Sequence, residues 1–288
     1  MNKLIRAGIF RYCKSTVFRA MLAASLGLGI FTGSFTNSHF YIEYNFFLGI
    51  FLVIAIQISL IIGTEFSNGI VRNNVISGHS KGIIFLSELL LSLMFSAVLF
   101  AVYFGVFAAF NAHWFSVMET GDVFVIAVGF LFMHLSSAVI CTAICFFISQ
   151  NTTVAAVVNL VLILGMALGS YELQSVLEEP EYLQTVEVNE KGMMVESAVI
   201  PNPSYIPRES EKYIILHTVY YLMPCGQLRD YAKNLYGVWN ESLYDRWNMS
   251  YPEHYEIGSL KTAPLYSLTA MGLFTAAGFL YFRKKDLK

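Results

Sequence analysis

Apolar residues run almost without interruption through six stretches of this chain, and polar residues gather between them. The six runs cover about 17–36, 46–64, 83–110, 122–148, 153–171 and 264–282. Most of them reach the roughly 20 residues with which an α-helix crosses a hydrocarbon core about 30 Å thick. The first run is the weakest because Ser25, Thr32 and Ser34 interrupt it. The pattern predicts an all-α polytopic membrane protein with six transmembrane helices.

Composition narrows the class of protein further. Hydrophobic residues make up 56% of the chain and charged residues only 13%, whereas soluble domains carry about 25% charged residues. A soluble globular enzyme is therefore excluded, and the 24 Phe exclude a disordered chain. A net charge of −2 argues against a nucleic-acid partner. The partner that the composition predicts is the lipid bilayer.

The basic residues predict the orientation, because Lys and Arg accumulate on the cytoplasmic side of short loops. Three segments carry them: the residues before the first run, the connection between the second and third runs, and the residues after the sixth run. The opposite loops, about 37–45 and 111–121, contain no Lys or Arg. Both termini are therefore expected in the cytoplasm, and the membrane is expected to be the plasma membrane.

A long acidic segment separates the fifth and sixth runs. Residues 172–263 hold 14 of the 20 acidic residues, seven of the 18 basic residues, ten of the 17 Tyr and none of the Phe. We expect three parts: 1–171 with five spans, 172–263 as an extracellular domain, and 264–288 with the last span and a basic cytoplasmic tail. Within the acidic segment, 186–188 and 193–195 flank 189–192 as a possible β-hairpin. Helices are predicted at 209–223 and 227–235, stopped by Pro224 and Gly226; they dip into the outer leaflet or cap the bundle.

Two common catalytic signatures are missing from the sequence. There is no GxxxxGK[ST] phosphate loop and no HExxH. We therefore expect no intrinsic catalysis, no metal site and no cofactor on this chain.

The cytoplasmic connection between the second and third runs, 63–81, has the pattern of a short interfacial helix. Ser67 or Asn68 is expected to cap it, Ser77-Gly78 to end it, and Ser80 to begin the next helix. Such a helix suits docking into a groove of a soluble partner. The alternative is a plain connector that lies on the membrane.

Here the residues resemble a known family. Glu65-Phe66-Ser67-Asn68-Gly69, then Arg72-Asn73 and Ile76-Ser77-Gly78, are similar to the connection between the second and third spans of type 2 ABC transporter permeases. The segments 221–227 and 282–287 resemble the family's stretch before the last span and its usual ending. The chain departs from the family at Ile70, where Thr is usual, and at Asn74, where Lys is common.

The resemblance implies a permease subunit, bacterial, that exports a peptide, a lipid-like molecule or a drug-like molecule. It implies a second permease as homodimer or heterodimer partner, and two copies of a cytoplasmic ABC ATPase that bind ATP and Mg²⁺. It also implies that a coupling helix, about 65–81, docks on the ATPase through a set of nine residues: Glu65, Phe66, Asn68, Gly69, Arg72, Asn73, Ile76, His79 and Lys81. The acidic outer segment favours a cationic or amphipathic substrate, such as an antimicrobial peptide.

The first 14 residues fit an amphipathic helix like the elbow helix of that family. Ile5, Ile9, Tyr12 and Cys13 group on one side, and the basic residues, Arg11 included, lie mostly on the other. The alternative is a basic topology anchor without a helix.

Four polar residues within the runs are candidates for a transport pathway: Gln57, Glu88, His134 and Asn159. Ionisable groups in a membrane usually face a cavity or a partner. Glu88 is expected to pair with inward-facing bases, and His134 either lines a pathway or makes a structural hydrogen bond. Gly165 and Gly169 allow a close helix approach, which is either a dimer face or packing within the chain.

Two functions from other classes remain open. A non-transporting sensor or immunity protein would bind peptides through 172–263. A passive channel is disfavoured because the spans lack a charged ring.

Overall fold

Six helices of the computed structural model are long and apolar enough to cross a membrane, as the sequence predicts. The structure describes residues 1–39, 44–148, 151–188, 194–246 and 258–286. The six helices are α2 (Thr16–His39), α3 (Tyr44–Ser67), α5 (Lys81–Phe110), α7 (Thr120–Ile148), α8 (Thr152–Leu177) and α11 (Gly258–Lys284). This is the architecture of a multi-pass membrane protein. α8 and α11 run beyond the expected spans, at their C-terminal and N-terminal ends respectively.

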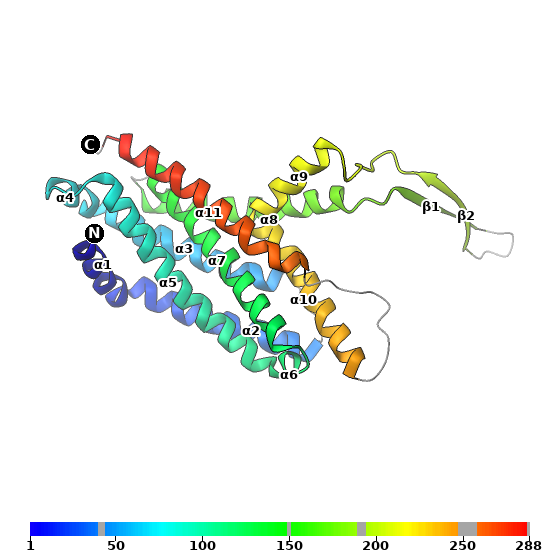
Figure 1. The fold of residues 1–288 in the computed structure, drawn as a ribbon. Coiled ribbons are helices and arrows are strands. Elements are labelled where there is room, and N and C mark those ends of the chain that lie inside the picture. Colours follow the sequence, from blue (N-terminus) through cyan, green and yellow to red (C-terminus); the bar gives the residue numbers. More distant parts are fainter. Residues whose placement is uncertain (40–43, 149–150, 189–193, 247–257, 287–288) are drawn as a thin grey trace.

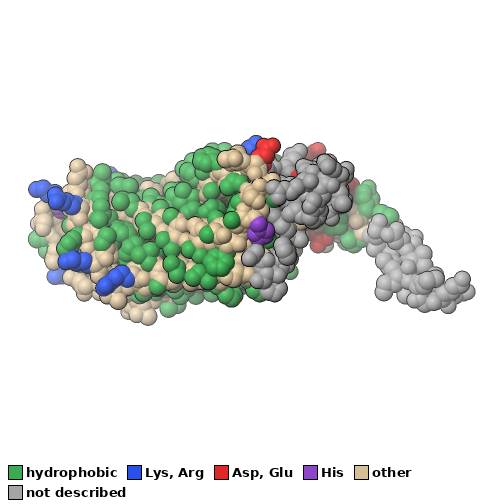
Figure 2. All heavy atoms as spheres, turned by 90° about the horizontal axis from the view of Figure 1, so that it is seen from below, with side chains coloured by type: hydrophobic (Ala, Val, Ile, Leu, Met, Phe, Trp, Pro, Cys, Tyr) green, Lys and Arg blue, Asp and Glu red, His purple; other side chains and the backbone are tan. Residues whose placement is uncertain are grey.

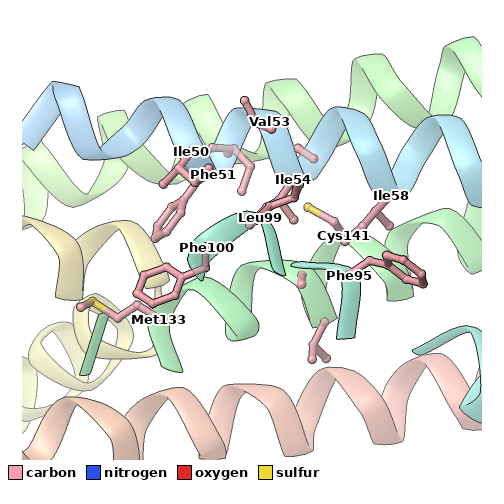
Figure 3. Packing of buried hydrophobic residues seen from close by; sticks show 14 of the residues in the cluster. Ile50, Phe51, Val53, Ile54, Ile58, Phe95, Leu99, Phe100, Met133 and Cys141 are labelled. Carbon is pink, nitrogen blue, oxygen red and sulfur yellow. The ribbon is translucent and has the colours of Figure 1, made fainter. Parts of the chain in front are cut away.

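Three of these helices form the centre of the bundle. α3, α5 and α7 are the most buried, whereas α2, α8 and α11 lie at the periphery. α2 packs on α5, α8 on α3, and α11 on α7. Side chains of the three central helices meet in one aromatic and aliphatic cluster (Figure 3). Within it the ring of Phe130 lies edge-on to Phe47 and to Phe100, at centroid distances of 5.2 and 5.3 Å.

Two short helices complete the end of the bundle that carries the termini. α1 (Asn2–Lys14) precedes the first span and packs on α5, and α4 (Ile70–Ile76) connects α3 with α5. Figure 1 places α1, α4 and the end of α11 together, and blue basic side chains gather at this end in Figure 2. We call it the basic end. The predicted N-terminal helix is thus present.

The opposite end is built from the acidic segment and the short α6 (Ala112–Phe115). Strands β1 (Tyr182–Val188) and β2 (Met194–Pro201) pair antiparallel, with Tyr182 opposite Pro201 and an irregularity between Thr185 and Val186. Figure 1 shows this pair projecting beyond the helices, so we call this the hairpin end. Both strands are longer than predicted, and the predicted turn at 189–192 lies entirely outside the described part of the chain.

Two further helices, α9 (Glu211–Leu222) and α10 (Pro224–Arg246), follow the strands. Pro224 does not only stop α9 but also begins α10, because a proline is tolerated where a helix N–H has no partner. The turn needs Gly226: a Cβ there would lie 2.2 Å from the backbone oxygen of Tyr220. α10 is much longer than the predicted 227–235.

α10 packs against α8, α7 and α3 and joins the main core. Tyr231 donates a hydrogen bond to the backbone oxygen of Ile126, and Cys225 lies 3.7 Å from the backbone oxygen of Ile163. Of the two arrangements that the sequence left open for this helix, packing on the bundle is therefore observed.

Candidate docking surface and buried polar residues

The helix α4 is held between two glycines in the left-handed region. Gly69 (φ 69°) is its N-cap and Gly78 (φ 89°) follows its last turn. The prediction that Ser67 or Asn68 caps it is wrong. The hydroxyl of Ser67 turns back to the Gly63 carbonyl at 2.9 Å and lies 3.0 Å from the Thr152 hydroxyl, so it is committed to α3 and α8. Since glycine adopts positive φ without a steric penalty, the backbone itself makes the turn.

The next helix begins where the sequence predicts. The Ser80 hydroxyl accepts a hydrogen bond from the Ile83 amide at 3.3 Å, as an N-cap does.

Gly69 of the predicted docking set caps α4, and the other eight residues divide into an exposed group and an inward group. Asn68, Arg72 and Asn73 are exposed, and Ile76 is 75% exposed. Val71 on the opposite side of α4 is buried and fastens the helix to the bundle. The exposed side of α4 and the adjoining Asn68 therefore present one cation, two amides and one apolar side chain at the basic end.

The inward group lies between the helices. Glu65 is buried, and Phe66 packs edge-on against Phe146 at 5.2 Å. His79 is half-buried, and Lys81 donates its ammonium to the backbone oxygen of Lys285. Glu65, Phe66 and Lys81 hold the ends of α3 and α5 in place.

Lys285, just after α11, closes the end of α7. Its ammonium donates to the backbone oxygens of Phe146 and Phe147 at 3.2 and 2.7 Å. Carbonyls at a helix C-terminus have no partner within the helix, and a basic side chain supplies one. Burial lowers the pKa of Lys285.

A buried ion-pair cluster connects α1 with two spans. The Nη2 nitrogen of Arg11 lies 2.9 Å from Glu65 and 3.5 Å from Glu88. The prediction that Glu88 pairs with a base is confirmed. The assignment of Arg11 to the solvent side of its helix is wrong, and so is that of Cys13 to the apolar side, since Cys13 is exposed. Tyr12 fills the apolar side and stacks on Phe95 at 4.5 Å.

His134 and Asn159 make structural hydrogen bonds inside the subunit. His134 Nε2 lies 3.1 Å from the backbone oxygen of Ser96, which supports the structural alternative for this residue. The amide nitrogen of Asn159 lies 2.8 Å from the Ser59 hydroxyl and 3.2 Å from the Cys141 carbonyl, so it ties α8 to α3 and α7. Gln57 is buried in α3, and among the described residues neither end of its amide has a partner.

None of the four pathway candidates reaches the surface of the subunit. Gln57, His134 and Asn159 are fully buried, and Glu88 is 3% exposed. In the single subunit these four side chains therefore lie between the helices and not on the outer surface.

The two glycines of α8 face outward. A Cβ at Gly165 or Gly169 would meet nothing within 4 Å, and Val161, Leu164 and Leu168 around them are exposed. The alternative of close packing within the chain is therefore wrong. This side of α8 is open in the single subunit.

No protein-family model matches the chain, and neither a curated protein nor a solved structure matches it.

Proposed function

We propose that this chain is the permease subunit of an ATP-driven ABC exporter and that a separate ATPase docks on α4. The observation that carries the proposal is the short helix between the second and third spans, with Arg72, Asn73 and Ile76 exposed on it. It coincides with the sequence segment that resembles the coupling helix of type 2 permeases. Two copies of the ATPase bind ATP and Mg²⁺, and this chain contributes no nucleotide site.

The ion-pair cluster gives α4 a mechanical connection to the spans. Glu65 lies one turn before the end of α3, and Arg11 ties it to α1 and to Glu88 of α5. A displacement of α4 by the ATPase therefore moves α1, α3 and α5 together. Substrate passes between two permeases, and coupling is reciprocal, so that substrate also changes the rate of ATP hydrolysis. The open side of α8 with Gly165 and Gly169 is the face we propose for the second permease.

The docking surface is tested by charge reversal. The tagged chain is purified from its own host, and the recovered proteins are identified by mass spectrometry. We expect the native chain to retain an ATPase with a phosphate loop, and the variant Arg72→Glu/Ile76→Asp to lose at least nine-tenths of it. The reason is that the variant replaces an exposed cation and an exposed apolar side chain, which are typical anchors of an interface.

Lys212→Glu, an exposed change on α9 at the other end of the bundle, is the matched control and retains the ATPase. Undiminished recovery with the double variant, or no such ATPase with the native chain, would contradict the proposal.

The proposed orientation places the basic end in the cytoplasm of a bacterium and the hairpin end outside. Asn73 and Glu209 are exposed at opposite ends. In a Cys13→Ser background, in which the other three cysteines are buried, a membrane-impermeant maleimide added to intact cells is expected to label Glu209→Cys and to leave Asn73→Cys unlabelled. The reverse labelling would invert the topology. The neighbouring Ser210 is avoided because its hydroxyl caps α9.

A further inference from the structure

A cavity of about 420 Å³ lies at the hairpin end, between the C-terminal end of α8 and the helices α9 and α10. This volume is within the range of small-molecule sites. Three stretches far apart in the sequence contribute its lining: Gln174, Leu177, Glu178, Arg208, Tyr213, His217, Tyr220, Tyr221, Asp230 and Lys233. The docking surface on α4 is at the other end of the molecule (Figure 1).

Asp230 gives the cavity a carboxylate that no described Lys or Arg pairs with directly. Its two oxygens accept one hydrogen bond each, from Tyr220 at 2.8 Å and from Tyr221. In the part of the chain that the structure describes, no Lys or Arg nitrogen forms an ion pair with it. A carboxylate has about four acceptor positions, so two remain open for a donor. Burial raises the pKa of Asp230, and the hydrogen bonds from Tyr221 and Tyr220 act in the opposite direction.

The other charges of the cavity differ in how far they are neutralised. Lys233 is paired with Glu178 at 3.1 Å. Arg208 is exposed, and no ion pair of it occurs among the described residues. The cavity therefore offers one open anion, Asp230, and one open cation, Arg208.

Aromatic rings line the side of the cavity that α9 provides. His217 stacks on Tyr213 at 5.6 Å and lies 4.6 Å from Tyr221. The face of an aromatic ring attracts an organic cation within about 6 Å. Burial lowers the pKa of His217, so its ring is neutral at pH 7 and does not repel such a cation.

The opposite face of α9 is apolar and uncovered. Ile214 and Ile215 are 55% and 61% exposed, and Val219 is 44% exposed. Since α9 packs beside the end of the spanning helix α8, this face lies where the hydrocarbon of a membrane begins. A helix with an apolar face of this kind settles at the membrane interface.

We propose that this cavity binds the headgroup of a zwitterionic phospholipid, with its ammonium on Asp230 among the rings and its phosphate on Arg208. The apolar face seats α9 in the membrane interface, which puts the cavity on its other side at the level of the phospholipid headgroups. A primary ammonium, as in an ethanolamine headgroup, supplies the donors that the open acceptor positions of Asp230 require. Binding of this lipid at the cavity does not require that the chain acts as a transporter.

Isothermal titration calorimetry of the full chain in maltoside detergent tests the assignment. The probes are dihexanoylphosphatidylethanolamine and dihexanoylphosphatidylglycerol, each kept below its critical micelle concentration. We expect saturable binding of the ethanolamine lipid and at least tenfold weaker binding of the glycerol lipid, which lacks the ammonium. Asp230→Asn and Arg208→Gln should each weaken binding of the ethanolamine lipid at least tenfold.

Lys212→Gln removes an exposed cation of α9 that does not line the cavity and should bind like the native chain. Arg208 is exposed, so its variant keeps the test valid even where Asp230→Asn does not fold. Equal binding of the two lipids, or native binding by Arg208→Gln, would overturn the assignment. So would displacement of the ethanolamine lipid by an equimolar lysine decapeptide, which would make the cavity a site for cationic peptides. All three outcomes leave the ATPase docking test unaffected.

Discussion

Replacing Arg11 by glutamine is expected to destabilise the folded chain by about 2–3 kcal/mol, less than the roughly 3–5 kcal/mol found when a fully buried ion pair loses one partner, because the Arg11 side chain is 33% exposed. The Nη2 nitrogen of Arg11 lies within 4 Å of both Glu65 and Glu88, which are 4% and 3% exposed. Without the guanidinium, two carboxylates remain side by side with no cation between α3 and α5. The measurement is the denaturation midpoint of the detergent-purified protein.

A matched series of variants separates this electrostatic effect from simple loss of a side chain. Arg6→Gln removes an exposed cation from the same helix and should leave the midpoint unchanged. Glu65→Gln together with Glu88→Gln in the Arg11→Gln background removes the unpaired charges and should recover most of the loss. If Arg11→Gln behaves like Arg6→Gln, the cluster does not stabilise the fold.

The ion pairs of Arg11 are contacts that the local sequence could not predict. The pattern of α1 assigns every cation to the solvent side, because a helical wheel contains only local information. The partners of Arg11 lie 54 and 77 positions further along the chain, and only the folded bundle brings them together. The six spans, in contrast, follow from local hydropathy and length, which is why they were predicted within a few residues.

In the acidic segment, too, the elements follow from local sequence and the contacts between them do not. Its composition indicates a polar environment, and the sequence predicts the order of two strands and two helices, although both strands and α10 are longer than expected. The cavity was not predicted, because Glu178, Arg208 and Asp230 come from three separate elements. Isolated tyrosines and charged residues in the sequence do not indicate a cavity. They come together only because the chain turns back near Gly226 and α10 enters the core.

The glycines of the spans allow the most direct steric prediction. Gly63 of α3 faces the start of α8, where a Cβ would lie 2.7 Å from the Cα of Thr152. That contact is with backbone, so no rotation of a side chain relieves it. Gly63→Val should therefore force α3 and α8 apart and strain both the Ser67–Thr152 contact of 3.0 Å and the hydrogen bond from Asn159 to Ser59.

We expect Gly63→Val to cost at least the 1–3 kcal/mol that is typical of overpacking, measured as a fall in the denaturation midpoint and in the yield of monodisperse protein. Gly105→Val is the matched control: it places the same side chain within a spanning helix where a Cβ meets nothing within 4 Å. Since the clash is with the Cα, adding Thr152→Gly to Gly63→Val should not restore the midpoint. Full recovery by that second change would show that only the threonine side chain fixes the distance between the two helices.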